Sequence, residues 1–141
     1  MKNIIHTIDN KISYITINRS EKLNSLSNGV IDELIDVVAE INKLNKSRIA
    51  IITGKGDKAF IAGADIKEMF LMTKNESLRY AKKGQLLTKM IEDSNIPFIA
   101  AINGFALGGG CEIALACHLR YSLMSAKFGQ PEVSLGLIAG F

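Results

Sequence analysis

The amino-acid sequence predicts an α/β fold, in which short β-strands alternate with helices along one domain spanning residues 1–141. Two observations carry this prediction. Apolar residues recur at helical spacing over residues 28–45, where Ile31, Leu34 and Val38 share one face. Short continuous apolar runs, such as residues 49–53, are typical of strands that are buried on both faces. Since runs of both kinds follow one another throughout, we expect stacked layers of helix and sheet.

The composition is that of a globular protein. Hydrophobic residues make up 48% of the chain and charged residues 22%, which excludes a disordered polar chain. The net charge is +3 with no basic block, so a nucleic-acid partner is not expected. No apolar run approaches the length of a membrane span or of a signal peptide, and no membrane association is expected. Cys111 and Cys117 form no C-x-x-C pair, which favours reduced thiols and a cytoplasmic location.

The first half of the chain predicts a strand at residues 3–9 and another at residues 11–18, around Asp9-Asn10. Ser27 is the expected N-cap of the helix over residues 28–45. A buried strand follows at residues 49–53. The stretch 59–66 is then expected to form a short strand and a glycine-containing bend.

The second half predicts a long helix over residues 75–93 and a buried strand at 98–102. Asn103-Gly104 is expected to turn the chain, and a short helix is expected at about 110–117. A last pair of strands is predicted near residues 119–123 and 126–129.

Two glycine-containing segments are candidate ligand sites. In Ala62-Gly63-Ala64-Asp65 the side chains are small, so a ligand can approach the backbone. If Asp65 begins a helix, the N–H of Ala64 is free to bind an oxyanion. Taken alone, the segment is more simply explained as a bend that needs a flexible residue.

The run Gly108-Gly109-Gly110 precedes a helix, where the backbone favours negative charge. Its spacing fits neither a dinucleotide-binding fingerprint nor a phosphate-binding P-loop. A tight turn required only by packing is the alternative.

Two carboxylates stand in unusual surroundings. Glu112 lies in an apolar stretch, and Glu132 follows Gly129-Gln130-Pro131 in a predicted loop. Two carboxylates at one site can act as base and acid; two ordinary salt-bridging glutamates are the alternative. Structural roles are expected for His6 and His118, because neither has a neighbour at metal-ligand spacing.

Taken together, four stretches resemble the enoyl-CoA hydratase/isomerase (crotonase) superfamily. They are ITINRSEKLNSLS, IAIITGKGDKAFIAGADIKEM, IPFIAAINGFALGGGCEIALAC and AKFGQPEVSLGLIAGF, which occur in the family's order and cover nearly the whole chain. The resemblance implies a spiral of ββα units. It also implies that the chain corresponds to roughly the front half of a family member, truncated before the C-terminal helices.

The resemblance also implies a set of site residues. The N–H groups of Ala64 and Gly109 would hold a thioester carbonyl, while Glu112 and Glu132 would be the catalytic carboxylates. The residues expected to contact the CoA and acyl parts of the substrate are Lys22, Leu23, Ala62, Asp65, Ile66, Met69, Leu86 and Gly108.

The function implied is hydration of a short-chain 2-enoyl-CoA to a 3-hydroxyacyl-CoA. Neither a metal nor a redox cofactor is expected, since CoA belongs to the substrate, and the expected partners are the acyl-CoA and further copies of the chain in a trimer or hexamer. An enoyl-CoA isomerase is the alternative within the family. A truncated remnant that only binds acyl-CoA or self-associates is the alternative outside enzymes.

Overall fold

The computed structural model describes residues 2–136 and 138–141. In chain order the elements are β1 (Ile4–Asp9), β2 (Ile12–Ile17), η1 (Ser20–Lys22), α1 (Asn28–Leu44), β3 (Ile49–Gly54), β4 (Ala59–Ile61), α2 (Ile66–Phe70), α3 (Lys74–Glu92), β5 (Phe98–Ile102), β6 (Phe105–Leu107), α4 (Gly109–Ala116), β7 (Leu119–Ser122), β8 (Lys127–Gly129) and η2 (Pro131–Leu135). The α/β class is confirmed, and Ser27 caps α1 as predicted by accepting a hydrogen bond from the N–H of Val30.

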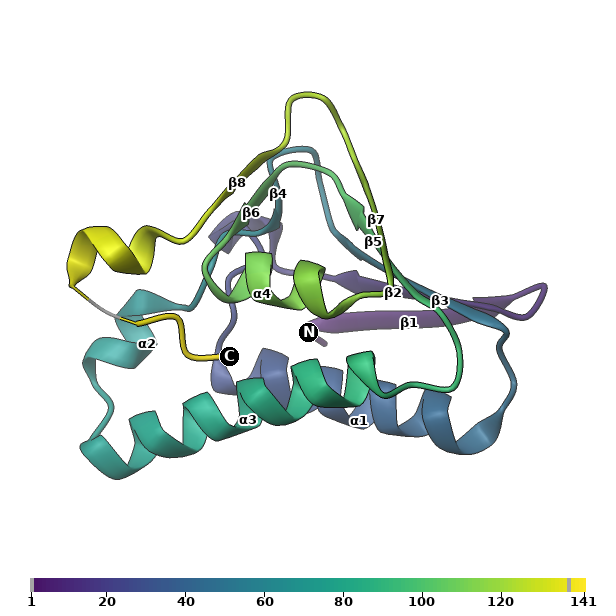
Figure 1. Cartoon of the computed structure of the whole chain (residues 1–141), viewed down its shortest axis with the longest axis horizontal. Helices are drawn as coiled ribbons and strands as arrows, with labels where there is room; N and C mark the ends of the chain where they lie inside the picture. The colour runs from purple at the N-terminus through teal and green to yellow at the C-terminus, as the bar shows by residue number, and fades with distance from the viewer. Residues whose placement is uncertain (1, 137) are drawn as a thin grey trace.

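Successive units of two strands and a helix build the molecule (Figure 1). The first strands of the units, β3, β5 and β7, extend the β1–β2 hairpin into a five-stranded sheet of order β1-β2-β3-β5-β7. Only β1 is antiparallel to its neighbour. The second strands form a separate parallel sheet of order β4-β6-β8. The expected succession of ββα units is therefore observed.

The last two predicted strands are both present, but they do not pair with each other. β7 pairs with β5 in the large sheet and β8 pairs with β6 in the small one. A turn closed by the hydrogen bond from the N–H of Ala126 to the carbonyl of Leu123 lies between them. It redirects the chain from one sheet to the other, as happens between β3 and β4 and between β5 and β6.

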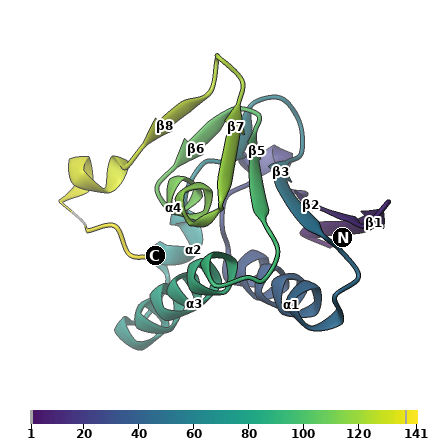
Figure 2. The same ribbon diagram turned by 45° about the vertical axis from the view of Figure 1, so that its right-hand side comes forward.

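The helices cover the strands from one side. Figures 1 and 2 show α1 and α3 running side by side, and α4 packs on α3, β4 and β6. The core consists of fully buried aliphatic and aromatic side chains from both sheets and these helices, among them Ile15, Ile31, Ile52, Phe60, Leu87 and Phe98. No helix within residues 2–136 and 138–141 is long and apolar enough to cross a membrane.

Two short elements were not predicted from the sequence. β6 has three residues and α2 has five, so neither is long enough to show a hydrophobic period. Asp65 does begin a helix, as the sequence left open, because its side chain accepts a hydrogen bond from the N–H of Glu68.

Asn24 holds the loop between β2 and α1 against the turn after β3. Its side chain is fully buried; Nδ2 donates to the carbonyls of Lys55 and Ala59 at 3.0 and 2.8 Å, and Oδ1 accepts from the N–H of Arg19 at 3.0 Å. Its φ of 56° is a left-handed conformation that asparagine tolerates better than most residues.

Asn24→Ala is expected to lower the free energy of unfolding by about 3 kcal/mol, because it removes the side-chain partner of three backbone groups, two of them in buried hydrogen bonds. Urea unfolding followed by circular dichroism measures the change. Asn10→Ala is the matched control, since Asn10 has a φ of 47° but is exposed, and among the described residues its side chain bonds only to Asp9. We expect a loss of about 1 kcal/mol or less there; equal losses at the two positions would contradict the role given to the Asn24 hydrogen bonds.

Candidate active site

Three loops meet at the carboxyl edge of the small sheet. Because β4, β6 and β8 are parallel, their carboxyl ends lie at the same edge, where open α/β sheets commonly bind ligands. Ala62–Asp65 follow β4, Gly108 follows β6, and Gln130 follows β8. Each loop leads directly into a helix or 3-10 helix. The sheet thus brings the two glycine-containing segments and the two predicted carboxylates to one place.

The geometry of the first loop frees the N–H of Ala64. Leu26 forms a parallel β-bridge with Ala64, in which the N–H of Leu26 donates to the carbonyl of Gly63 and the carbonyl of Leu26 accepts from Asp65. In such a bridge the central residue's own N–H points away from its partner. Among the described residues, the N–H of Ala64 has no acceptor. Gly63 makes this bend possible with a φ of 96°.

The glycine run places a second free N–H group beside the first loop. Gly108 is the N-cap of α4 with a φ of 50°, and Gly109 is the first helical residue, so its N–H has no partner within the helix. A Cβ on Gly63 would lie 3.4 Å from the carbonyl oxygen of Leu107, which shows how closely the two loops approach. The third glycine, Gly110, serves packing, since a Cβ there would collide with Ile61 of β4.

Glu132 lies directly against this glycine turn. A Cβ on Gly108 would overlap with Glu132 Oε1, so the carboxylate occupies the space that the missing side chain leaves. Glu132 Oε2 is buried and has no hydrogen-bond partner among the described residues. A buried acceptor without a partner is costly to folding, which is typical of a group kept for function rather than stability.

Glu112 lies in the first turn of α4 and is half-buried. Its Oε1 accepts a hydrogen bond of 3.0 Å from the N–H of Phe141. Burial raises the pKa of the Glu112 carboxyl above its ordinary value, the Phe141 N–H opposes that rise, and the negative charge of Glu132 adds to it. The carboxylate is therefore a stronger base than an exposed glutamate, as proton abstraction near neutral pH requires.

Glu112→Gln is expected to make the fold more stable at neutral pH. An acid whose pKa is raised by folding contributes most to stability at low pH, and loses that contribution as the pH rises from its unfolded pKa through its folded pKa. Glutamine stays neutral and keeps an oxygen for the Phe141 N–H. The variant should therefore gain stability over the parent chain at pH 7, and the gain should shrink towards pH 4.

Glu76→Gln is the matched control and has the opposite sign. Glu76 closes a capping box with Thr73 at the start of α3, and the hydrogen bonds from Thr73 lower its pKa. Its contribution to stability is present at neutral pH and is lost as the pH falls. Chemical unfolding from pH 4 to pH 7.5 measures both variants; a Glu112→Gln chain that is less stable than the parent at pH 7 would contradict the account.

Asp65, which the sequence assigns to substrate binding, is tied to two basic side chains. Arg19 Nη2 lies 3.0 Å and Lys22 Nζ 3.7 Å from its Oδ2. Burial opposes ionisation of Asp65, but the hydrogen bond from Arg19 and the positive charge of Lys22 hold its pKa below the ordinary value. The arrangement fixes the Ala62–Asp65 loop and leaves Lys22 half-exposed beside it. A direct contact of Asp65 with a ligand stays a prediction.

The other residues predicted to contact the substrate lie in different parts of the structure. Leu23 and Ile66 are exposed beside the loop after β4, and Ala62 is joined to Leu23 by a backbone hydrogen bond of 3.1 Å. Met69 packs on the core from α2. Leu86 is half-exposed and lies about 200° around α3 from Gly84, the glycine of α3 that faces the site. The structure does not bring Leu86 to the glutamates, and its proposed acyl contact stays a prediction.

Three site residues were missed by the sequence analysis. Arg19 is buried and also donates to the carbonyl of Ser25 at 2.7 Å. The hydroxyl of Tyr80 donates to the carbonyl of Leu26 at 2.9 Å, the same carbonyl that the Ala64 bridge uses. Phe141 reaches Glu112 across 29 positions. No local pattern signals the contacts of Tyr80 and Phe141, nor that of Arg19, which stands in the polar stretch Asn18-Arg19-Ser20-Glu21 after β2.

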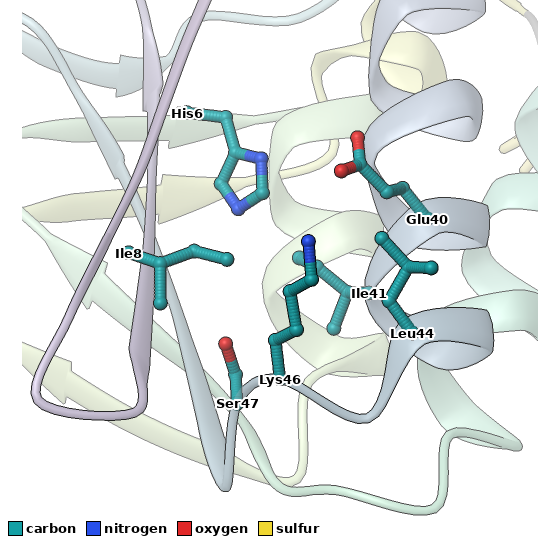
Figure 3. A pocket seen from close by; sticks show the side chains of 7 residues that line it. All are labelled: His6, Ile8, Glu40, Ile41, Leu44, Lys46 and Ser47. Carbon is teal, nitrogen blue, oxygen red and sulfur yellow. The ribbon is translucent and has the colours of Figure 1, made fainter.

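A small pocket lies away from this site, between β1 and the end of α1, with a volume of ≈ 10 Å³. Figure 3 shows its lining side chains, among them His6, Glu40 and Lys46. His6 Nε2 lies 3.1 Å from Ser13 Oγ, which lies 2.8 Å from Ser47 Oγ. A histidine engaged in a buried chain of hydroxyls has a structural role, as predicted. His118 has one too, since its Nδ1 accepts from the N–H of Phe98.

The chain matches a known family over most of its length. The family model for enoyl-CoA hydratase/isomerase matches residues 7–141. The short-chain-enoyl-CoA hydratase of Clostridium acetobutylicum is 43% identical over 100% of this chain and 54% of its own length. The crotonyl-CoA hydratase of Syntrophomonas wolfei is 44% identical over 99% of this chain and 54% of its own.

A solved structure agrees with the sequence comparisons. The crystal structure of enoyl-CoA hydratase from Bacillus anthracis superposes with a TM-score of 0.94 at 39% identity, over 98% of this chain and 54% of that one. The chain thus spans about half the length of the relatives it matches, and the predicted spiral of ββα units is confirmed. By its sequence, its fold and the arrangement of these loops, the chain belongs to the enoyl-CoA hydratase/isomerase family.

Proposed function

We propose that the protein is an enoyl-CoA hydratase, which adds water across the 2,3 double bond of a short-chain 2-enoyl-CoA. The observation that carries the proposal is the meeting of Glu112, Glu132 and the free N–H groups of Ala64 and Gly109 at one sheet edge. The names of the two relatives, a short-chain-enoyl-CoA hydratase and a crotonyl-CoA hydratase, support the same substrate class.

The proposed mechanism begins with the thioester carbonyl. Its oxygen accepts hydrogen bonds from the N–H groups of Ala64 and Gly109, which draw electron density from the conjugated double bond. Glu112 takes a proton from water as the water oxygen forms a bond to C3. The electron pair of the double bond moves onto the thioester oxygen as an enolate, where each N–H donor is worth about 3–4 kcal/mol.

Glu132 completes the reaction. As the enolate collapses, Glu132 gives a proton to C2, and the 3-hydroxyacyl-CoA is formed. Glu112 has then gained one proton and Glu132 has lost one, so proton exchange with solvent restores both. The raised pKa of Glu112 suits it to the basic step. The steps proposed here use neither a metal ion nor a redox cofactor, and the absence of both stays a prediction.

Binding of the CoA part is proposed at the loops next to this edge. Lys22 is a half-exposed cation beside Asp65 and is suited to a phosphate. Leu23, Ala62 and Ile66 form an adjoining backbone and apolar surface, and Gly108 admits the thioester close to the helix start. The exposed apolar side chains of β7, β8 and the turn between them, including Tyr121, Met124 and Phe128, support the proposal of a homo-oligomer.

Hydration of crotonyl-CoA tests the proposal. The ultraviolet absorbance of the conjugated enoyl thioester is expected to fall when the protein is added, and Glu112→Gln and Glu132→Gln should each lower the rate by about 10²–10⁴-fold. Glu40→Gln, an exposed glutamate on α1 beside the pocket of Figure 3, is the matched control and should leave the rate unchanged.

The alternatives predict other outcomes. Conversion of a 3-enoyl-CoA to the 2-enoyl isomer without hydration would favour an isomerase. A folded protein that binds crotonyl-CoA, leaves its absorbance unchanged and isomerises nothing would contradict the enzymatic proposal and favour an acyl-CoA-binding protein. Cys111 and Cys117 are free thiols, and the cytoplasmic location inferred from the sequence stays a prediction.

A further inference from the structure

Gly84 stands at an unfavourable position for glycine, near the middle of the 19-residue helix α3. Glycine at an interior helical position costs about 1 kcal/mol relative to alanine. The capping box of α3 is formed by Thr73 and Glu76 and does not involve Gly84. A Cβ built on Gly84, however, would collide with the ring of Phe141, whose Cγ, Cδ1 and Cε1 are the nearest atoms. The missing side chain therefore makes a notch that the Phe141 ring fills.

The ring is held in this notch from two further sides. It packs against Tyr80, with the ring centroids 5.6 Å apart and the planes inclined at 53°. A Cβ on Gly109 would lie 2.9 Å from its Cε2, so the ring also lies against the start of α4. One position along α3 from the notch, Gln85 Nε2 donates to the carbonyl of Gly140 at 3.0 Å. Helix α3 thus contacts both the ring of Phe141 and the carbonyl of Gly140 that precedes it.

The position of the Phe141 ring determines a contact of Glu112. With the ring seated, the backbone N–H of Phe141 donates to Glu112 Oε1 at 3.0 Å. No other hydrogen bond to the Glu112 carboxylate occurs among residues 2–136 and 138–141. The titratable groups that face this carboxylate are Glu132 from η2, Tyr80 from α3 and Cys111 from its own helix. The Phe141 N–H is thus what orients the carboxylate.

We propose that Gly84 is a positioning residue for Glu112: its missing side chain seats the Phe141 ring on α3, and the seated ring holds the Phe141 N–H on Glu112 Oε1. This inference deepens the proposed function. It rests on that function only in taking Glu112 as a catalytic residue. A side chain at position 84 would act at a distance, by lifting Phe141 out of the notch and freeing the carboxylate to change its rotamer.

The test is the coupling between Glu112 and the Phe141 amide, followed by NMR without substrate. In the parent chain, the Phe141 amide proton is expected to shift with pH in step with the labelled carboxyl carbon of Glu112. Glu112→Gln should abolish that shift. Gly84→Ala should reduce it to less than half, whereas Ser77→Ala, an exposed position on the same helix, should leave it unchanged.

The melting temperature distinguishes Gly84 from an ordinary position of the helix. Alanine at an ordinary helical position stabilises by up to about 1 kcal/mol, so Ser77→Ala should raise the melting temperature and Gly84→Ala should not. If Gly84→Ala fails to fold, Phe141→Ala removes the ring, keeps the N–H and should lose the coupling equally. Full coupling in a folded Gly84→Ala or Phe141→Ala chain would overturn the inference. Because no turnover is measured, failure of the crotonyl-CoA assay leaves this test intact.

Discussion

Gly108→Ala is expected to lower the rate of crotonyl-CoA hydration by about 10²-fold or more, the loss expected when a general acid is displaced. The new methyl group would overlap with Glu132 Oε1, so the carboxylate must leave its place against the glycine turn. The φ of 50° at Gly108 adds backbone strain for any residue with a Cβ. The variant should therefore lose activity to a far greater extent than it loses stability.

Gly136→Ala is the matched control for Gly108→Ala. Gly136 has a φ of 68°, yet a Cβ there would meet nothing within 4 Å. Both variants place alanine at a positive φ, but ψ is −125° at Gly108 and 24° at Gly136, so Gly108→Ala carries the larger backbone strain in addition to the displacement of Glu132. Steady-state kinetics together with urea unfolding compares them. Similar rates for the two folded variants would show that the Glu132 position does not matter for catalysis.

Removal of the N–H of Ala64 or of Gly109 is expected to lower the rate of hydration about as much as Gly108→Ala does. Replacing either residue with its α-hydroxy acid turns the peptide N–H into an ester oxygen and changes no side chain. Each replacement should reduce kcat by about 10²–10³-fold, the loss typical of one oxyanion donor. Ester substitution at Lys74, the first residue of α3, is the control, because it also removes an N–H without an intrahelical partner and should change kcat little.

Local patterns in the sequence were enough for most of the elements. The helical spacing of Ile31, Leu34 and Val38 predicted α1, and the serine before it predicted the cap. The buried runs predicted β3 and β5. These features depend on neighbours within one or two turns or on alternation along one strand, so the sequence carries them directly.

Long-range pairing could not be predicted in the same way. The choice of β6 rather than β7 as the partner of β8 depends on where the preceding units place their strands. The contact of Phe141 with Glu112, and the reason for glycine at position 84, likewise depend on segments that meet only in the folded chain. Such contacts produce no pattern among neighbouring residues, so composition and spacing do not predict them.

The candidate site was nevertheless predictable in outline, because its chemistry lies in short segments. Ala62-Gly63-Ala64-Asp65 and Gly108-Gly109-Gly110 were candidate backbone sites, and Glu112 and Glu132 a candidate carboxylate pair. The resemblance to the family favoured these roles over ordinary turns and salt-bridging glutamates. What the sequence lacked was the reason that they meet, namely the shared carboxyl edge of β4, β6 and β8. The support provided by Arg19 and Tyr80 behind the first loop was also absent from the sequence analysis.

The central claim is that the N–H groups of Ala64 and Gly109 polarise a bound enoyl thioester, and carbon NMR tests it most directly. Crotonyl-CoA labelled at the thioester carbon is bound to the Glu112→Gln/Glu132→Gln chain, in which hydration is blocked. We expect the labelled resonance to move downfield on binding, and to return towards its free position when Ala64 and Gly109 carry ester linkages. A bound resonance at the free position, or one that the two esters leave unchanged, would contradict the account.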